Sequence, residues 1–237
     1  MEREVRYCTT EDGVRIAYCV EGEGPPLLLC PPLLWSFSQY YLEPEIEDFH
    51  RQIGAGRMLV HYDMRGAGLS QRDVDDMSLR VQISDVNAVA DAARLDRFAI
   101  WAPGASAFSA IKYVAENPGR VSALVLYSAS GQLLLSSEAL RAFEAIALTS
   151  WELFCRTVSD MGAARAEAGD GPLRHANALA QSSDAQTRVR LIRQNREVDG
   201  EAFLVSDLCT HPGNPQDCRL NYSDCVRPGS GGGDPRR

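Results

Sequence analysis

The sequence predicts an α/β fold, built on one β-sheet in which most strands run parallel. Three observations lead to this prediction. Short continuous apolar runs, of the kind needed by strands that are covered on both faces, recur between residues 27 and 127. Segments with apolar residues at helical spacing lie between these runs. Glycine and proline mark the boundaries, and strands that alternate with helices are typical of parallel sheets.

The composition indicates a globular protein. A chain of 237 residues matches one large α/β domain, because domains usually hold roughly 100–200 residues and α/β units reach about 250. Hydrophobic residues make up 45% and charged residues 24%, so the chain can bury a sizeable core. The net charge of −8 leaves no excess of cations for phosphates. We therefore expect neither nucleic acid nor a membrane as the main partner, and small neutral or cationic ligands remain open.

The N-terminal residues predict a cytoplasmic location. Met1–Arg6 alternates charges and lacks the apolar core of a signal peptide, and prolines interrupt the apolar stretch Leu27–Trp35. Seven cysteines is an odd number, so we expect no disulfide framework. Three of the cysteines lie inside strand-like apolar runs, where a free thiol behaves as a small hydrophobe: Cys8, Cys19 and Cys30.

The first elements predict the edge and centre of the sheet. Val5–Thr9 and Val14–Val20 are two β-rich runs joined by a turn at Gly13, which is typical of an antiparallel hairpin at a sheet edge. Leu27–Cys30 and Met58–Tyr62 are apolar runs typical of buried strands. A helix is expected between them, over Glu43–Ile53.

The next elements predict a βαβ unit. Ser78 is a candidate N-cap for a helix whose apolar residues recur at spacings of four and three. Phe98–Trp101 is a predicted strand, a helix follows over 107–114, and Ala123–Tyr127 is the next strand. The two strands should be parallel and joined by a right-handed crossover.

The C-terminal part predicts a helical cap over about 136–198. Helical patterns cover Glu138–Leu148, Trp151–Val158 behind the capping box Thr149–Glu152, and Ala185–Val198. Ala202–Val205 is the only later strand candidate, so the C-terminal core looks incomplete. We expect one domain over 1–207. Residues 208–237 carry three cysteines, four prolines and a glycine-rich run without apolar periodicity, which predicts an irregular or disordered tail.

Two stretches carry a resemblance to a known family. Asp63–Ser70 has the form Asp-x-Arg-Gly-x-Gly-x-Ser, and Asn117–Leu126 has the form of a helix end that leads into a strand. With the order of elements, they make residues 6–132 resemble the α/β-hydrolase superfamily. Gly56–Val60 and Tyr62–Arg65 are most similar to the hydrolase-like modules found in front of bacterial adenylate cyclases and LuxR-type regulators.

The resemblance implies a nucleophile elbow, a tight turn that presents a serine between a strand and a helix. The Gly-x-Ser-x-Gly window aligns with Ala102–Ser106, which places Gly104 in the nucleophile position. The window keeps small residues but lacks the nucleophile. In an alternative alignment Ser106 is the nucleophile, but the turn then shifts by two residues and Phe108 replaces the last glycine of the motif.

The resemblance also implies an oxyanion loop, where Pro31 and Pro32 replace the usual His-Gly. Backbone N–H groups of Leu33 and Ala105 are the candidate donors to a pocket beside Gly104, and the dipole of the following helix favours negative charge there. Such a pocket would bind an anion or a carbonyl group without cleaving it.

A catalytic histidine should follow the last strand of this fold. His175 lies in the expected cap, and His211 comes only four residues after Asp207, so neither is placed as a general base. His61 lies in a predicted strand and His50 in a predicted helix, and both precede the elbow. Another group has zinc-type side chains but no closed-site spacing, so we expect no metal or cofactor: Cys209, His211, Cys218 and Cys225.

The sequence therefore predicts an α/β-hydrolase-fold protein that is catalytically inactive. It would act as a small-molecule-binding or sensory module, or be a truncated remnant. The alternative is an active, esterase-like serine hydrolase that uses Ser106.

Overall fold

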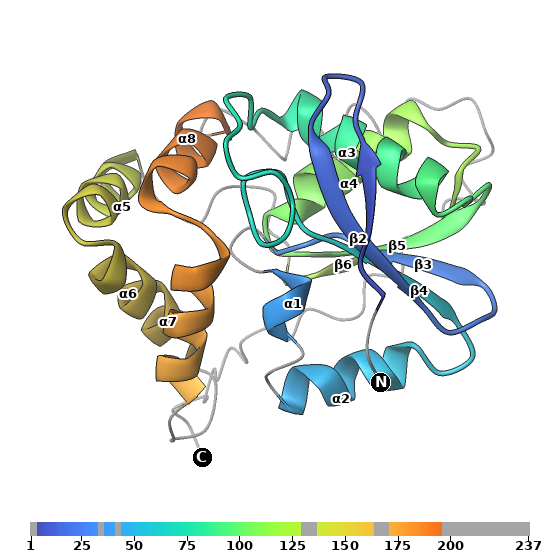
Figure 1. Ribbon diagram of the computed structural model, residues 1–237, viewed down its shortest axis with the longest axis horizontal. Coiled ribbons are helices and arrows are strands. Elements are labelled where there is room, and N and C mark those ends of the chain that lie inside the picture. Colours follow the sequence, from blue (N-terminus) through green and yellow to red (C-terminus); the bar gives the residue numbers. More distant parts are fainter. Residues whose placement is uncertain (1–3, 33–35, 41–43, 129–136, 164–170, 196–237) are drawn as a thin grey trace, which may run out of the picture.

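The structure is a computed structural model, and it describes residues 4–32, 36–40, 44–128, 137–163 and 171–195. The described part has two regions: a β-sheet with helices on both faces, and a group of helices beside it (Figure 1). The strand candidate Ala202–Val205, the tail 208–237 and the loop residue Leu33 lie outside the described residues.

The described strands form one six-stranded sheet, in the order β1-β2-β4-β3-β5-β6. β1 pairs with β2 and β2 with β4 in antiparallel fashion, and the remaining neighbours are parallel. This arrangement confirms the predicted mostly parallel sheet with an antiparallel hairpin at its N-terminal edge. The strands are β1 Arg6–Thr9, β2 Arg15–Glu21, β3 Pro26–Leu29, β4 Met58–Tyr62, β5 Phe98–Pro103 and β6 Val121–Tyr127.

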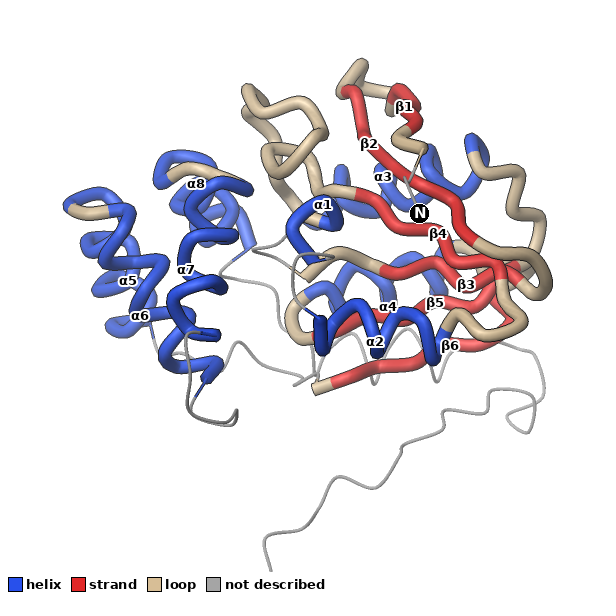
Figure 2. Tube along the Cα trace, turned by 60° about the horizontal axis from the view of Figure 1, so that its bottom comes forward, coloured by secondary structure: helices blue, strands red, loops and turns tan. Residues whose placement is uncertain are grey.

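Helices cover both faces of the sheet because its central strands are apolar on both sides (Figures 1 and 2). α3 (Leu79–Ala92) and α4 (Ser106–Glu116) cover one face, where Leu28 joins the main core. α2 (Pro44–Ile53) covers the other face, where Leu27 and Leu29 pack together. Successive residues of a strand point to opposite faces, so one apolar run supplies both cores. Burial of each such side chain contributes roughly 1.5–3 kcal/mol.

The four described helices of the second region form the predicted cap, and they lie to one side of the sheet (Figures 1 and 2). The cap has a core of its own, to which Phe154, Cys155 and Leu179 belong. Leu191, from the last of these helices, belongs instead to the main core. The cap helices are α5 Ser137–Thr149, α6 Trp151–Ala163, α7 Gly171–Ser182 and α8 Ala185–Asn195.

One local prediction is confirmed in its position, and another needs correction. Ser78 occupies the N-cap position of α3, but its side chain makes no capping hydrogen bond. At α6 the predicted capping box is displaced by one residue, because Oγ of Ser150, and not of Thr149, accepts the hydrogen bond from the backbone N–H of Leu153 at 3.3 Å. Two helices, α7 and the short α1 (Phe37–Tyr40), were not predicted.

The described helices include none that is both long and apolar enough to cross a membrane. Cys19 and Cys30 are buried free thiols, as predicted for small core residues, whereas Cys8 is only half-buried.

Candidate functional site

The turn between β5 and α4 has the geometry that an elbow needs. β5 ends at Pro103, α4 begins at Ser106, and Gly104 between them has φ +55°, in the left-handed region. The backbone N–H of Gly104 donates to the carbonyl oxygen of Tyr127 in β6 at 2.9 Å. A Cβ atom built on Gly104 would meet no atom of the described residues within 4 Å. Among these residues the position therefore has open space for a side chain, but it carries none.

Ser106 lies in the first turn of α4 and is only 2% exposed. Its Oγ donates a hydrogen bond to the carbonyl oxygen of Pro103 at 2.7 Å. Within the described part of the chain, no histidine or carboxylate accepts a hydrogen bond from this hydroxyl. Phe108 is also buried, two residues further along the helix. Ser106 therefore packs at the helix start, and its hydroxyl is directed at the backbone.

Only one of the two predicted backbone N–H donors lies within the described residues. Ala105 is the N-cap residue of α4, directly after Gly104, so it lies at the positive end of the helix dipole. Leu33, the other candidate donor, lies outside the described residues. The turn thus offers a helix N-terminus beside an open position, an arrangement that favours a partial negative charge.

The described histidines do not assemble a triad at the elbow. His175 is half-buried in α7. His61 is buried in β4, and its Nε2 lies 3.7 Å from Oε2 of Glu21, which fits a structural role. His50 is buried in α2, edge-on to the ring of His61 at 5.0 Å between centroids. His211 and the three cysteines of the zinc-type group lie outside the described residues, and the described residues contain no metal-binding cluster.

Asp63 holds the loop after β4 in place. The loop carries the motif Asp63–Ser70, and the carboxylate of Asp63 is fully buried. It accepts hydrogen bonds from Oγ of Ser36 at 2.8 Å and from the backbone N–H groups of Phe37 and Leu69 at 2.7 and 2.8 Å. Burial raises the pKa of this carboxyl to about 6, although the three donors favour its ionised form. Asp63 thus joins the start of α1 to the motif loop.

Arg65 ties the same loop to the hairpin and to α3. Its side chain is fully buried, and its Nε and Nη2 donate to the carboxylate of Asp85 at 2.9 and 2.7 Å. Its Nη1 donates to Asp12 at 2.7 Å. The hydrogen bond from Arg65 lowers the pKa of Asp12 to about 2. The arginine of the motif therefore has a structural role in this chain.

The connection between α7 and α8 contacts the motif loop through hydrogen bonds. The backbone N–H of Gly68 donates to the carbonyl oxygen of Ser182 at 2.7 Å, and Oγ of Ser183 donates to that of Gly66 at 3.3 Å. A Cβ on Gly66 would lie 2.6 Å from Cγ2 of Thr187. Since this loop follows the carboxyl end of β4, the cap meets the sheet at the edge where the elbow also lies.

Arg188 is a buried charged residue near the contact between the cap and the motif loop. The sequence analysis did not identify it as a candidate site residue. Its side chain in α8 is 3% exposed, and within the described part of the chain its Nε and Nη2 have no hydrogen-bond partner. Burial lowers the pKa of Arg188 to about 9. Its place three residues before the apolar Leu191, on the same face of the helix, is compatible with burial but does not identify it from the sequence.

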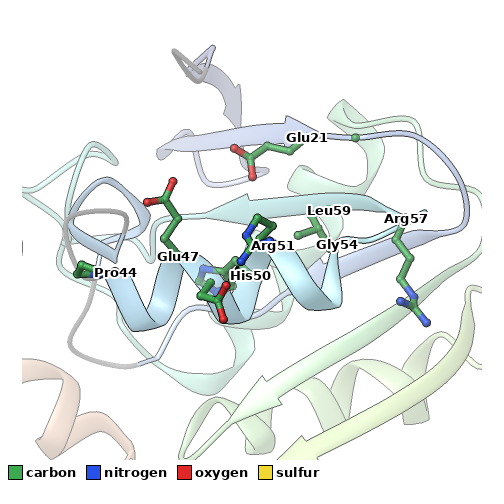
Figure 3. A pocket seen from close by; sticks show the side chains of 10 residues that line it. Glu21, Pro44, Glu47, His50, Arg51, Gly54, Arg57 and Leu59 are labelled. Carbon is green, nitrogen blue, oxygen red and sulfur yellow. Dashed lines mark hydrogen bonds and ion pairs between the residues drawn. The ribbon is translucent and has the colours of Figure 1, made fainter.

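A pocket of about 500 Å³ opens elsewhere, between α2 and the sheet (Figure 3). It lies where β4 begins, whereas the elbow follows the carboxyl end of β5, which runs in the same direction. The pocket is therefore separate from the predicted site. Its lining includes Glu21, Glu47, Asp48, His50, Arg51 and Arg57.

Comparison with known proteins establishes the fold. No protein-family model matches the sequence. No curated protein matches it either. Among solved structures, the chain is similar to a bromoperoxidase from Bacillus anthracis with a TM-score of 0.73 and 15% identity, over 85% of this chain and 77% of that one.

Two further structures extend the comparison. An esterase from Exiguobacterium antarcticum has a TM-score of 0.73 and 16% identity, over 85% of this chain and 76% of that one. A bottromycin epimerase in complex with bottromycin A2 has a TM-score of 0.68 and 18% identity, over 83% and 75%. At these identities the likeness shows the fold alone: the chain has the α/β-hydrolase fold.

Proposed function

We propose that this chain is a binding module with the α/β-hydrolase fold, which takes up a small molecule at the carboxyl edge of its sheet without cleaving it. One observation carries the proposal: Gly104 lies at the elbow turn in the left-handed conformation, and no described residue fills the space where a nucleophile would project. A glycine supplies no atom to attack a substrate. What remains is a helix N-terminus beside a vacant position.

The surroundings of Ser106 support the absence of hydrolysis. A serine hydroxyl attacks efficiently only when a base takes its proton. The Ser106 hydroxyl is buried and donates to the carbonyl oxygen of Pro103, and a backbone carbonyl is no general base. The esterase alternative would need this hydroxyl to turn away from Pro103 towards a base that the described residues do not supply.

A sensory role in the cytoplasm agrees with the resemblance to the modules in front of adenylate cyclases and LuxR-type regulators. Among the structural neighbours, one is described as an epimerase, so the fold is not restricted to ester hydrolysis. We propose a small-molecule ligand and no nucleic acid or membrane partner, in line with the net charge of −8.

Two measurements on the purified chain test the proposal. The first is labelling with a fluorophosphonate probe for active-site serines, compared between the parent and Ser106→Ala. The second is thermal unfolding in the presence of a panel of small molecules, since a ligand that binds only the folded state raises the melting temperature. Stabilisation without labelling supports the proposal. Labelling that Ser106→Ala abolishes would establish the esterase instead.

A further inference from the structure

Arg188 has an unused hydrogen-bonding edge. Nε and Nη2 lie on the same side of a guanidinium and present two nearly parallel N–H bonds, the pair that a carboxylate accepts in a bidentate manner. These two atoms of Arg188 are fully buried and have no hydrogen-bond partner among the described residues. The side chain is 3% exposed, so water does not readily replace the missing acceptor.

Arg65 shows what the same edge does when it is satisfied. Nε and Nη2 of Arg65 both donate to the carboxylate of Asp85, and the side chain is as deeply buried as that of Arg188. The described part of the fold therefore contains two buried arginines. Nε and Nη2 bind a carboxylate in one of them, and they bind no described carboxylate in the other. The difference indicates that an acceptor for Arg188 comes from outside the described chain.

The neighbours of Arg188 do not neutralise it. Asp184 is the nearest acid that acts on its charge, but its two carboxylate oxygens accept hydrogen bonds from the backbone N–H and the Oγ of Thr187, both at 2.9 Å. Cys155 is a neutral neighbour, because burial raises the pKa of its thiol to about 11. Arg72 adds a second positive charge, and its Nη1 donates only to backbone carbonyl oxygens, of Gly68 and Gln181.

The two arginines also differ in their access to solvent. Arg72 is exposed on the loop after β4, whereas Arg188 is buried in α8. Because the charge of Arg72 acts on Arg188, a negative group bound at Arg188 would be attracted by both arginines. The net charge of −8 does not oppose this, because the field at short range depends on the nearest charges.

We propose that Arg188 and Arg72 bind the carboxylate of a small organic acid, at the junction between the cap and the loop that follows β4. Nε and Nη2 of Arg188 donate to the two carboxylate oxygens, and the nearby charge of Arg72 adds electrostatic attraction. This rests on the proposed binding function and names the class of its ligand. A planar, singly charged carboxylate matches the two parallel donors better than a phosphate dianion, which needs more donors than this junction supplies.

Thermal unfolding of the full chain tests this inference with straight-chain sodium carboxylates from acetate to octanoate. The corresponding primary amides match them in shape without the charge, and sodium chloride and sodium phosphate control for ionic strength and for other anions. The variants are Arg188→Met, Arg72→Met and the control Arg193→Met. Arg193 lies on the same helix and is exposed, where it pairs with Glu144.

We expect one or more carboxylates to raise the melting temperature of the parent, and the matching amides, chloride and phosphate to leave it unchanged. Arg188→Met should lose this rise completely, Arg72→Met should lose part of it, and Arg193→Met should keep it. Without ligand, Arg188→Met should melt no lower than the parent, because it removes a buried charge that has no partner.

Several results would overturn the inference. Stabilisation by amides but not by carboxylates would refute it while leaving the binding function intact, whereas no stabilisation by any small molecule would refute both. An equal response to phosphate would remove the preference for a carboxylate. A ligand-free Arg188→Met that unfolds far below the parent, or fails to fold, would show that the guanidinium already has a partner in the folded chain.

Discussion

The Oγ atom of Ser106 donates a hydrogen bond to the carbonyl oxygen of Pro103, 2.7 Å away, across the turn that joins β5 to α4. This contact fixes the hydroxyl to the backbone in the first helical turn. Ser109 makes a similar contact one turn later, with its Oγ donating to the carbonyl oxygen of Ser106 at 3.0 Å. The two serines form a matched pair, because both are buried and both bond to a carbonyl three residues earlier.

The first prediction concerns these two serines. Ser106→Ala and Ser109→Ala should each lower the free energy of unfolding by about 1 kcal/mol, the usual contribution of one such hydrogen bond. Neither should change the rate of p-nitrophenyl acetate hydrolysis, which should equal that of heat-denatured protein in the parent. Chemical denaturation and a spectrophotometric assay measure both quantities. A saturable rate in the parent that only Ser106→Ala removes would contradict the inactive interpretation.

The second prediction concerns Gly104 and tests whether a nucleophile can be restored. Gly104→Ser and Gly104→Ala should both lower the free energy of unfolding by about 1–3 kcal/mol, because φ of +55° strains any residue that has a Cβ. No described residue lies close enough to add steric overlap to this strain. Gly119→Ala is the control: a Cβ there also meets nothing, and its φ lies outside the left-handed region.

Gly104→Ser should also remain inactive towards esters, since no described histidine is placed to take its proton. Stopped-flow hydrolysis of a p-nitrophenyl ester should show neither a burst nor steady turnover. A burst followed by turnover would reveal a base that lies outside the described residues.

The sequence predicted the central strands well because the apolar residues that indicate a buried strand are consecutive in the chain. In Leu27–Leu29 every residue is apolar, since the strand is covered on both faces, and no long-range knowledge is needed to see it. The start of β6 was placed two residues late. Val121 is only half-buried and Ser122 is polar and exposed, so no apolar run marks these two residues. α7 was missed because it begins with Gly171-Pro172, which is typical of a turn, although proline also favours the first turn of a helix.

The residues of the candidate site also differ in whether the sequence could predict them. Gly104 could be found from sequence because an elbow is a local turn with short-range requirements. Arg188 could not, because α8 also contains Arg190 and Arg193, and only the packing of the helix separates the three. Arg188 is buried, whereas Arg190 reaches the carbonyl oxygen of Val74 and Arg193 pairs with Glu144 at the surface.

The third prediction separates backbone strain from steric overlap in two glycines with positive φ. Gly68 has φ +55°, and a Cβ there would overlap Oδ2 of Asp63 and Oγ of Ser36. Gly13 has φ +83° in the β1–β2 turn, and a Cβ there would meet nothing within 4 Å. Gly13→Ala should therefore lower the free energy of unfolding by about 1 kcal/mol. Gly68→Ala should lower it by more than about 3 kcal/mol, because it also displaces the buried carboxylate.

Chemical denaturation of both variants measures the difference. Equal losses for Gly68→Ala and Gly13→Ala would mean that the contacts of Asp63 contribute little to the fold, and that the motif loop tolerates rearrangement.

The fourth prediction concerns the pH dependence of the ion pair between Asp12 and Arg65. The hydrogen bond from Arg65 lowers the pKa of Asp12 to about 2, below the ordinary value of 3.8 for an aspartate. A depressed pKa means that the unfolded state binds the proton more readily, so the stabilising effect is fully present above about pH 4 and is lost as the pH falls through about 2. Asp12→Asn should therefore be less stable than the parent at pH 7, and the difference should shrink towards zero near pH 2.

The measurement is the free energy of unfolding of both proteins across this pH range, taken as a difference so that groups common to both cancel. Asp91→Asn serves as the control, because Asp91 is mostly exposed and its ion pair with Arg120 lies at the surface, where such pairs contribute roughly 0–1 kcal/mol. Its difference from the parent should be small at every pH. A difference for Asp12→Asn that persists unchanged to pH 2 would show that Asp12 acts through packing of the hairpin turn and not through its charge.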